Sequence, residues 1–241
     1  MDTFSASNTS VFVVASAENH NYFGTAFAFA SSSSSLFLMT CAHVVRNLGS
    51  KNLLVGEDRV RADTVWISDE HDAGDFAILI VDKASMPNVP LLPLAHETKS
   101  AYSAAAVGYL PMDSQRYAKQ AFRGELHEPI LLTSKQSNDK VGAWVSPFTG
   151  DLEADNGISG APVMDIQTGN VIGLIARREG QSDKLWVLSI DRFVPIRLTP
   201  TPPRYRFVPI LEVRCNRASA FSSNEYRRSP ARRSALSALA A

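Results

Sequence analysis

The chain has 241 residues, nearly half of them apolar, which is enough to bury the core of one large domain or of two small ones. Its formal net charge is zero, so the whole molecule has no electrostatic attraction to nucleic acid or to acidic membranes. Two cysteines exclude a disulfide framework, and no apolar run approaches the roughly 20 residues that span a bilayer. Because the N-terminal segment lacks the pattern of a secretory signal, we expect a soluble protein of the cytoplasm with no membrane partner.

Short apolar or alternating segments, separated by turn residues, follow one another along most of the chain and predict β-strands. The first group covers Ser10–Ala15, Gly24–Ala30, Leu36–Thr40, Asn52–Val55, Ala62–Ile67 and Phe76–Val81. The second group covers Ala104–Tyr109, Glu125–Leu132, Gly142–Val145, Pro162–Asp165, Val171–Ala176 and Leu185–Ile190. Strands this short and this frequent, with no long helical period between them, indicate an all-β sandwich or barrel.

A proline-rich stretch between the two groups, Met86–Pro93, predicts that the chain is divided into two strand domains, residues 1–92 and 93–200. The segment Asp191–Leu198 is a candidate for a short C-terminal helix. Pro195 limits this helix to about one turn unless the proline lies in the first turn. Further prolines then end the compact body.

The charge distribution separates the end of the chain from the rest. Residues 1–203 carry 16 basic and 22 acidic side chains, a net charge of −6, whereas residues 204–241 carry 8 and 2, a net charge of +6. The tail, residues 201–241, ends in a low-complexity mixture of serine, arginine and alanine, so we expect it to be partly disordered in the isolated protein. It is a candidate for docking a partner, and its few, scattered arginines do not favour a nucleic-acid role.

The first chemical signal is a histidine directly after an apolar strand, in the segment LMTCAHVV at Leu38–Val45. The strand ends in small residues and then His43, which places an imidazole on the rigid support that a general base needs. A lone histidine is more often an ordinary core or surface residue. Thr40 and Ala42 beside it weaken that alternative.

The second signal is Asp75, at the start of the apolar run GDFAILIV. A carboxylate in this position is partly buried and needs a partner. An imidazole N–H is suitable, because the carboxylate then fixes the tautomer of the ring and stabilises the imidazolium that forms during proton transfer. An ordinary turn aspartate is the alternative, since Asp69 and Asp72 lie nearby; Asp75 is preferred because it adjoins the strand.

The third signal is the turn NGISGAPVMD at Asn156–Asp165. Gly157 permits backbone angles that are closed to other residues. The N–H groups of Gly157 and Ser159 can then point into one concavity and form an oxyanion hole. Gly160 removes a side chain that would crowd the hydroxyl. A serine and glycine loop is the alternative, which the following Pro162 and strand make weaker.

In the order histidine, aspartate, serine, these motifs resemble those of the trypsin-like (chymotrypsin-fold) serine peptidases over about residues 10–198. The matching segments are GTAF, TCAHVV, DFAIL, GISGAP and GLIA. The resemblance implies an all-β fold of two six-stranded antiparallel barrels with the active site between them. It also implies a catalytic triad of His43, Asp75 and Ser159, acyl transfer on protein or peptide substrates, and no cofactor.

Two departures set the chain apart from the digestive and clotting members of that family. Ile158 stands where those members carry an aspartate that pairs with a newly cut N-terminus, and their disulfides are missing. The segments at Pro90–Ala95, Ala106–Tyr109 and Phe122–Leu126 resemble instead the bacterial effector-associated trypsin-like proteases of conflict systems. That resemblance implies a co-encoded effector protein as a substrate that cleavage activates.

The substrate preference stays open at this point. Counting six residues back from the serine puts Glu153 at the base of a side-chain pocket, where it would favour a basic substrate residue through a charge-assisted hydrogen bond. A solvated acidic loop is the alternative. Ala176, Arg177 and Arg178 would line the opposite wall, where arginines would favour an acidic substrate residue or would neutralise Glu153.

Two hypotheses from other classes accompany the peptidase. One is a protease-fold module that binds peptides without turnover, and the other is an adaptor that recruits partners through its tail. The presence of His43, Asp75, Ser159 and Gly157 together favours an active enzyme. The remaining histidines show no ligand spacing with the cysteines or with one another, so no metal site is expected.

Overall fold

The computed structural model describes residues 9–18, 22–69, 74–95, 99, 101–112, 117–134, 140–149, 157–178 and 184–191. All of these residues belong to one compact unit, Met1–Asp191. The predicted C-terminal helix, apart from Asp191, and the basic tail lie outside the described residues. In the described segments, no helix has both the length and the apolar character needed to cross a membrane.

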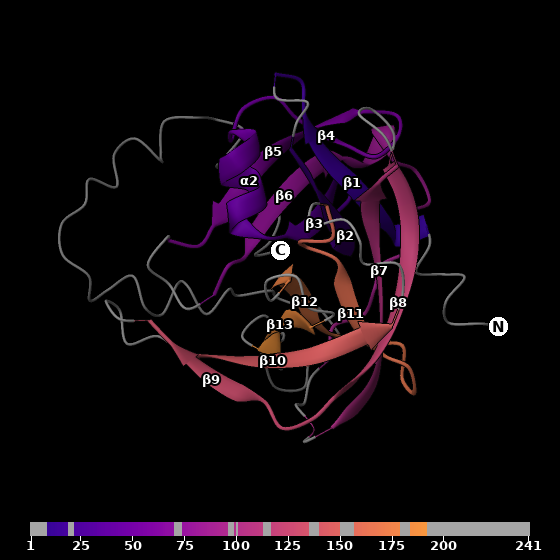
Figure 1. Cartoon of the computed structure of the whole chain (residues 1–241). Coiled ribbons are helices and arrows are strands. Elements are labelled where there is room, and N and C mark those ends of the chain that lie inside the picture. Colours follow the sequence, from indigo (N-terminus) through magenta and orange to yellow (C-terminus); the bar gives the residue numbers. More distant parts are fainter. Residues whose placement is uncertain are drawn as a thin grey trace, which may run out of the picture. The chain divides into compact units, whose positions relative to one another are not determined.

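Six antiparallel strands close into the first barrel, in the order β1-β2-β3-β6-β5-β4 (Figure 1). They are β1 (Val11–Ser16), β2 (Phe23–Ser31), β3 (Ser35–Thr40), β4 (Leu53–Val55), β5 (Val60–Ile67) and β6 (Ala77–Asp82). A short 3-10 helix, η1 (Lys83–Ser85), follows β6. Because the sheet closes on itself, its strands pair on both sides and leave no long free edge.

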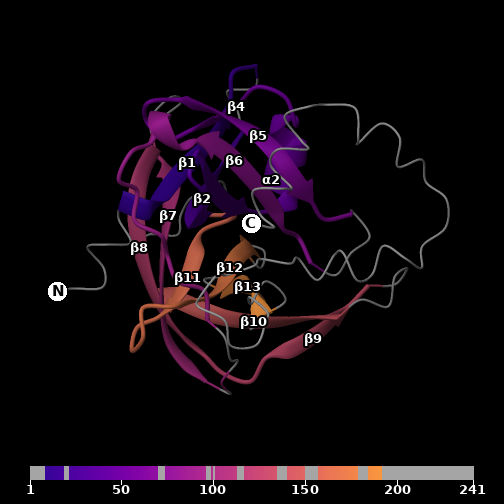
Figure 2. The ribbon, with the colours of Figure 1, turned by 180° about the vertical axis from the view of Figure 1, so that it is seen from behind.

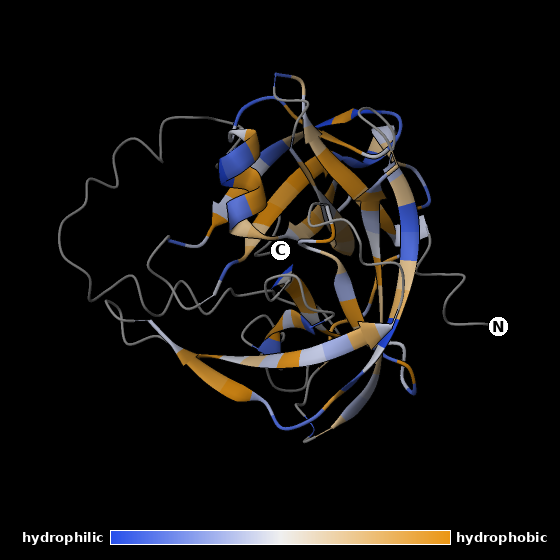
Figure 3. Cartoon of the chain, in the orientation of Figure 1, coloured by the Kyte–Doolittle hydropathy of each residue, from blue (hydrophilic) through white to orange (hydrophobic). Residues whose placement is uncertain are grey.

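Strand β2 is buried on both of its faces. Every residue from Gly24 to Ala30 is buried, although a strand with one wet face would alternate between buried and exposed side chains. One face lies in the core of the first barrel, and the other is covered by helix α2 (Ala42–Leu48) and by strand β7 of the second barrel. The central strands of this barrel are correspondingly apolar, as Figure 3 shows.

The second barrel contains six further strands in the order β13-β12-β11-β7-β8-β10, closed by the pairing of β10 with β13 (Figure 2). They are β7 (Tyr102–Pro111), β8 (Tyr117–Leu126), β10 (Lys140–Thr149), β11 (Pro162–Asp165), β12 (Val171–Arg178) and β13 (Lys184–Ser189). A seventh strand, β9 (Ile130–Thr133), pairs with the first half of β10. Large side chains that include Phe122, Trp144 and Phe148 fill the interior.

The segment between the barrels is hydrogen-bonded to both of them. The amide of Leu92 donates to the carbonyl oxygen of Ala28 in the first barrel at 2.9 Å. The amide of Ala95 donates to the carbonyl oxygen of Val171 in the second at 2.7 Å, and Val171 donates back to Pro93 at 2.8 Å. These bonds attach the start of β12, the strand that leads to the candidate site, to the connection between the barrels.

The predicted all-β fold of two six-stranded antiparallel barrels is confirmed. One strand prediction was wrong: the single strand expected over Glu125–Leu132 is the end of β8 and the separate strand β9. Most of β8 went unpredicted because it carries polar and half-buried residues over most of its length. Helix α2 was also missed, since its seven residues are too short to show a helical period.

Candidate active site

His43 is the second residue of helix α2, which begins directly after β3. Cys41 is the N-cap residue, in an extended conformation, and the apolar face of the helix buries Ala42, Val44 and Val45. The helix is thereby held against the barrel, while the side chain of His43 stays 37% exposed. A short packed helix thus fixes the position of the imidazole and leaves one face of it accessible.

Both oxygens of the Asp75 carboxylate are used on His43. Oδ1 accepts a hydrogen bond from the backbone N–H of His43 at 2.8 Å, and Oδ2 is hydrogen-bonded to its Nδ1. The carbonyl oxygen of Asp75 also accepts from the amide of Ala42 at 3.3 Å. Because an ionised carboxylate only accepts, Nδ1 must carry the proton, and Nε2 is left as the basic atom of the ring. The sequence prediction that these two residues meet agrees with this geometry.

Asp75 stays ionised in this environment. Burial by itself would raise the pKa of its carboxyl, but the hydrogen bonds from His43 and the charges of His43 and Arg46 outweigh burial and hold the pKa below its ordinary value. Arg46 lies one turn after His43 on the same helix and donates a hydrogen bond to the carbonyl oxygen of Ser68. Sequence reasoning did not identify Arg46, whose i+3 spacing from His43 becomes informative only once a helix is assigned.

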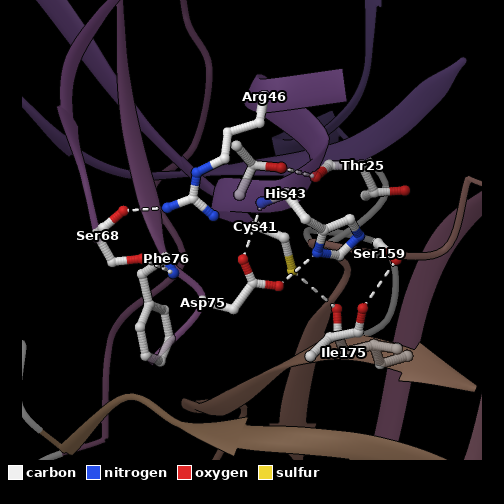
Figure 4. Close-up of polar contacts among 11 residues, drawn as sticks. Thr25, Cys41, His43, Arg46, Ser68, Asp75, Phe76, Ser159 and Ile175 are labelled. Atoms are coloured by element: carbon white, nitrogen blue, oxygen red, sulfur yellow. Dashed lines mark hydrogen bonds and ion pairs between the residues drawn. The ribbon is translucent and has the colours of Figure 1, made fainter. Parts of the chain in front are cut away.

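Ser159 lies on the far side of the imidazole from Asp75, at the tip of a turn from the second barrel (Figure 4). Its hydroxyl donates a hydrogen bond to the carbonyl oxygen of Ala176 on β12 at 2.9 Å. Its own carbonyl oxygen accepts from the amide of Thr25 on β2 at 2.8 Å. The turn is therefore held by one strand from each barrel.

Two glycines give this turn its shape. Gly157 and Gly160 have φ values of +99° and +89°, in the region that other residues rarely adopt. A Cβ on Gly160 would lie 2.0 Å from the carbonyl oxygen of Thr25, and one on Gly157 would lie 2.0 Å from the ring of Phe23. The turn thus needs glycine for its backbone angles and also for its close approach to β2.

A buried threonine that sequence reasoning missed connects the turn to both barrels. The hydroxyl of Thr25 donates to the carbonyl oxygen of Gly157 at 2.7 Å and accepts from the amide of Tyr109 at 3.0 Å. Its carbonyl oxygen accepts from the hydroxyl of Thr40 at 2.6 Å. The available signal was a hydroxyl inside the otherwise apolar strand GTAFAFA, since a buried hydroxyl needs partners.

Four amides of the turn differ in their use. Those of Gly160 and Ala161 donate to the carbonyl oxygens of Ile175 and Ile158, at 2.7 and 2.9 Å. The amides of Gly157 and Ser159 donate to no acceptor within the described segments. Two free N–H groups beside a serine hydroxyl are what an oxyanion hole requires.

A cavity of about 450 Å³ opens beside the imidazole. Its walls come from both barrels and consist of His43, Asp75, Leu132, Ala176, Arg177, Trp186 and Leu188. Two of the three residues that the sequence suggested for substrate binding, Ala176 and Arg177, therefore line one cavity with His43. The third, Glu153, lies outside the described residues.

The comparisons with known proteins agree with this geometry. Residues 24–174, which include His43, Asp75 and Ser159, match the model of the trypsin-like peptidase domain. The chain belongs to the trypsin-like peptidase family. It is accordingly a serine endopeptidase, an enzyme that cleaves proteins or peptides. No curated protein matches the chain.

Solved structures of other peptidases share the fold of this trypsin-like peptidase. An inactive serine-to-alanine variant of Rv3671c from M. tuberculosis H37Rv is 24% identical with a TM-score of 0.57, over 78% of this chain and 84% of that one. The active form of Rv3671c is 21% identical with a TM-score of 0.56, over 78% and 79%. The HtrA-type protease AlgW with a decapeptide is 15% identical with a TM-score of 0.56, over 78% and 63%.

Burial strongly alters the chemistry of Cys41 in this peptidase. Its thiol is fully buried and donates to the carbonyl oxygen of Ile175 at 3.3 Å. Burial, and then the charge of Asp75, raise its pKa well above the ordinary value, so the thiol is protonated. Ligand atoms of Cys41, His43 and Asp75 lie within 4.8 Å of one another, but a protonated, hydrogen-bonded thiol is not a metal ligand in this state.

Proposed function

We propose that this serine endopeptidase uses His43, Asp75 and Ser159 as its catalytic triad. The observation that carries the proposal is the hydrogen bond between the Asp75 carboxylate and Nδ1 of His43, which leaves Nε2 basic on the side of Ser159 (Figure 4). A carboxylate in this position holds the tautomer of the imidazole and stabilises the imidazolium that forms when the ring takes a proton.

The reaction proceeds in two acyl-transfer steps. The hydroxyl of Ser159 gives its proton to Nε2 of His43 while Oγ bonds to the carbonyl carbon of the substrate. The imidazolium gives that proton to the departing amine nitrogen, the C–N bond breaks, and an ester on Ser159 remains. Water then attacks the ester, with His43 again accepting and returning a proton, and the acid product leaves.

The negative oxygen that forms in each step would be bound by the amides of Gly157 and Ser159. Their freedom from acceptors within the described segments supports this role, because an oxyanion then meets donors that need not break another bond. Thr25 holds the same turn in place through its hydrogen bond to the carbonyl oxygen of Gly157. The mechanism also requires the Ser159 hydroxyl to exchange the carbonyl oxygen of Ala176 for Nε2, which a change of side-chain rotamer would achieve.

Substrate binding is assigned to Ala176, Arg177 and Glu153. Ala176 and Arg177 lie near the end of β12, beyond its last pairing with β11 at Leu174, so their backbone on that side pairs with no described strand. An extended peptide could add there as a further strand. Glu153 is kept as the candidate that would favour a basic substrate residue, on sequence spacing alone.

The cellular setting is proposed from sequence features. We place the peptidase in the cytoplasm, supported by the low cysteine count and by the free thiol of Cys41. The segments that resemble effector-associated proteases favour a role in a bacterial defence or conflict system, with a co-encoded effector as substrate. The basic tail, residues 201–241, is proposed to dock a partner.

One observation fits a second candidate, a protease-fold module or adaptor that binds peptides without turnover. The Ser159 hydroxyl is hydrogen-bonded to the carbonyl oxygen of Ala176 and not to His43. A protein held in this state would still bind peptides in its cleft but would not cleave them.

Cleavage of a complex peptide mixture by the wild type and by Ser159→Ala separates the two candidates. We expect new termini, identified by mass spectrometry, with the wild type and none with Ser159→Ala. Ser34→Ala, an exposed serine in a hairpin of the first barrel, is the matched control and should cleave like the wild type. Peptide binding without any cleavage by the folded wild type would reject the peptidase mechanism in favour of the binding module.

A further inference from the structure

Arg177 presents a positive charge to the cavity beside His43. Its guanidinium lies over the ring of Trp186, 5.0 Å from the ring centroid, and the residue is exposed. The two residues face each other across the pairing of β12 with β13, next to an irregularity in the register after Ile175. Stacking on the indole holds the guanidinium plane without using its N–H donors.

Among the residues that the structure describes, no acceptor occupies these donors. Within the described segments, Arg177 forms no ion pair with any carboxylate and no side-chain hydrogen bond. An arginine offers five N–H donors in a planar fork that matches the two oxygens of a carboxylate. Leu132, Leu188 and Trp186 form apolar walls beside it, and such walls strengthen the interaction between charges in the cavity.

The charges of the two other ionisable groups of the cavity, Asp75 and His43, balance each other during the reaction. The Asp75 carboxylate is bound at both oxygens by His43, and its lowered pKa keeps it ionised. When His43 takes a proton, the imidazolium balances that carboxylate. The guanidinium of Arg177 then remains as the one uncompensated charge among the described residues that line the cavity.

We propose that this cavity receives an acidic side chain, Asp or Glu, of the substrate and that Arg177 binds its carboxylate. The inference rests on the proposed function and names the substrate class of the same site. Because the net positive charge of the cavity is greatest when His43 is protonated, an acidic residue stabilises the transition state more than the bound substrate. The preference should therefore appear in kcat as well as in KM.

This preference is tested with matched decapeptides. They carry Glu, Gln or Lys in turn at each position before the cleaved bond. With the wild type, one position should show kcat/KM about tenfold higher for Glu than for the isosteric Gln, with Lys poorer still. Arg177→Gln should remove the difference, Arg177→Lys should keep part of it, and Arg177→Glu should favour Lys. Arg61→Gln, an exposed arginine of β5 outside the cavity, is the control and should behave like the wild type.

A binding measurement separates failure of this inference from failure of the proposed function. Fluorescein-labelled Glu and Gln decapeptides are titrated into Ser159→Ala and into the double variant with Arg177→Gln, and anisotropy is recorded. Tighter binding of Glu peptides that disappears in the double variant supports the inference even if no variant cleaves. Equal binding of Glu and Gln, a wild-type preference for Lys, or a Glu preference that persists without Arg177 would overturn it.

Discussion

At the scale of single residues, the Asp75 carboxylate couples the fold to the chemistry. Its two oxygens bind the backbone and the ring of the same histidine, so it fixes the start of helix α2 and the tautomer of the imidazole together. Hydrogen bonds to an ionised group are the stronger kind, which explains why this carboxylate stays ionised despite its burial. The stability of the fold and the catalytic activity should thus both depend on whether the Asp75 carboxylate is protonated.

Asp75→Asn should show this dependence in its unfolding. The pKa of Asp75 is lower in the folded protein than its ordinary value of about 4, so the ionised carboxylate stabilises the fold above that pH. The contribution is lost as the pH falls through the folded pKa. The free energy of unfolding in urea should therefore differ most between wild type and Asp75→Asn at pH 7 and least near pH 3. A difference that stays the same at both pH values would contradict the assignment.

Thr25 should be as sensitive as a catalytic residue although it touches no substrate. Thr25→Val keeps the shape but leaves the carbonyl of Gly157 and the amide of Tyr109 without their partner, at about 1–3 kcal/mol for each buried group. We expect the free energy of unfolding to fall by about that amount. The factor by which kcat falls should be larger than the factor by which KM changes. Thr25→Ser keeps the hydroxyl and should recover most of both. Equal behaviour of the two variants would show that the hydroxyl does not hold the turn.

At the scale of elements, the approach of β2 to helix α2 and to the serine turn sets the geometry of the site. Gly24→Ala would place a Cβ 2.5 Å from a methyl of Val44 and 3.2 Å from the carbonyl oxygen of Ser159. We expect destabilisation of about 1–3 kcal/mol from overpacking and a marked fall in activity. Gly142→Ala in β10 is the control, since its Cβ would come no closer than 3.3 Å to Ser189. Similar activity in both variants would mean that β2 does not position the site.

Elements with a strong local pattern could be predicted from the sequence, and the others could not. The apolar runs of β2, β3 and β6 identified the first barrel, and the glycines around Ser159 marked a turn whose positive φ values agree with that interpretation. Most of strand β8 was missed because its burial is set by neighbouring strands and not by its own composition.

The residues of the site also divide into those with a local sequence motif, which could be predicted, and those without one, which could not. His43, Asp75 and Ser159 each stand in a local motif, so sequence reasoning could nominate them. Thr25 and Arg46 could not be nominated, because their partners lie 132 and 22 residues away in the chain and appear only after the barrels have closed. The cavity between Arg177 and His43 depends on the same long-range assembly.

At the scale of the whole molecule, charge separates the chain into an acidic body and a basic tail. A chain that ends at residue 203 loses 8 basic and 2 acidic residues, which changes the net charge from zero to −6. If the tail docks a partner and takes no part in catalysis, this shortened chain should cleave peptides at the wild-type rate. Pull-downs with the full and shortened chains should then differ in the proteins they retain. A loss of peptide cleavage in the shortened chain would show that the tail belongs to the catalytic body.

Catalysis requires side chains from the two barrels to act as one reactive unit. The most direct measurement is reaction of the folded protein with a fluorophosphonate, followed by mass spectrometry of the modified peptide. We predict a single adduct on Ser159, formed rapidly by the wild type and slowed by about 10⁴-fold in Asp75→Asn, where the imidazole is held in the wrong tautomer. Absence of an adduct, or an adduct on another residue of the folded wild type, would contradict the account.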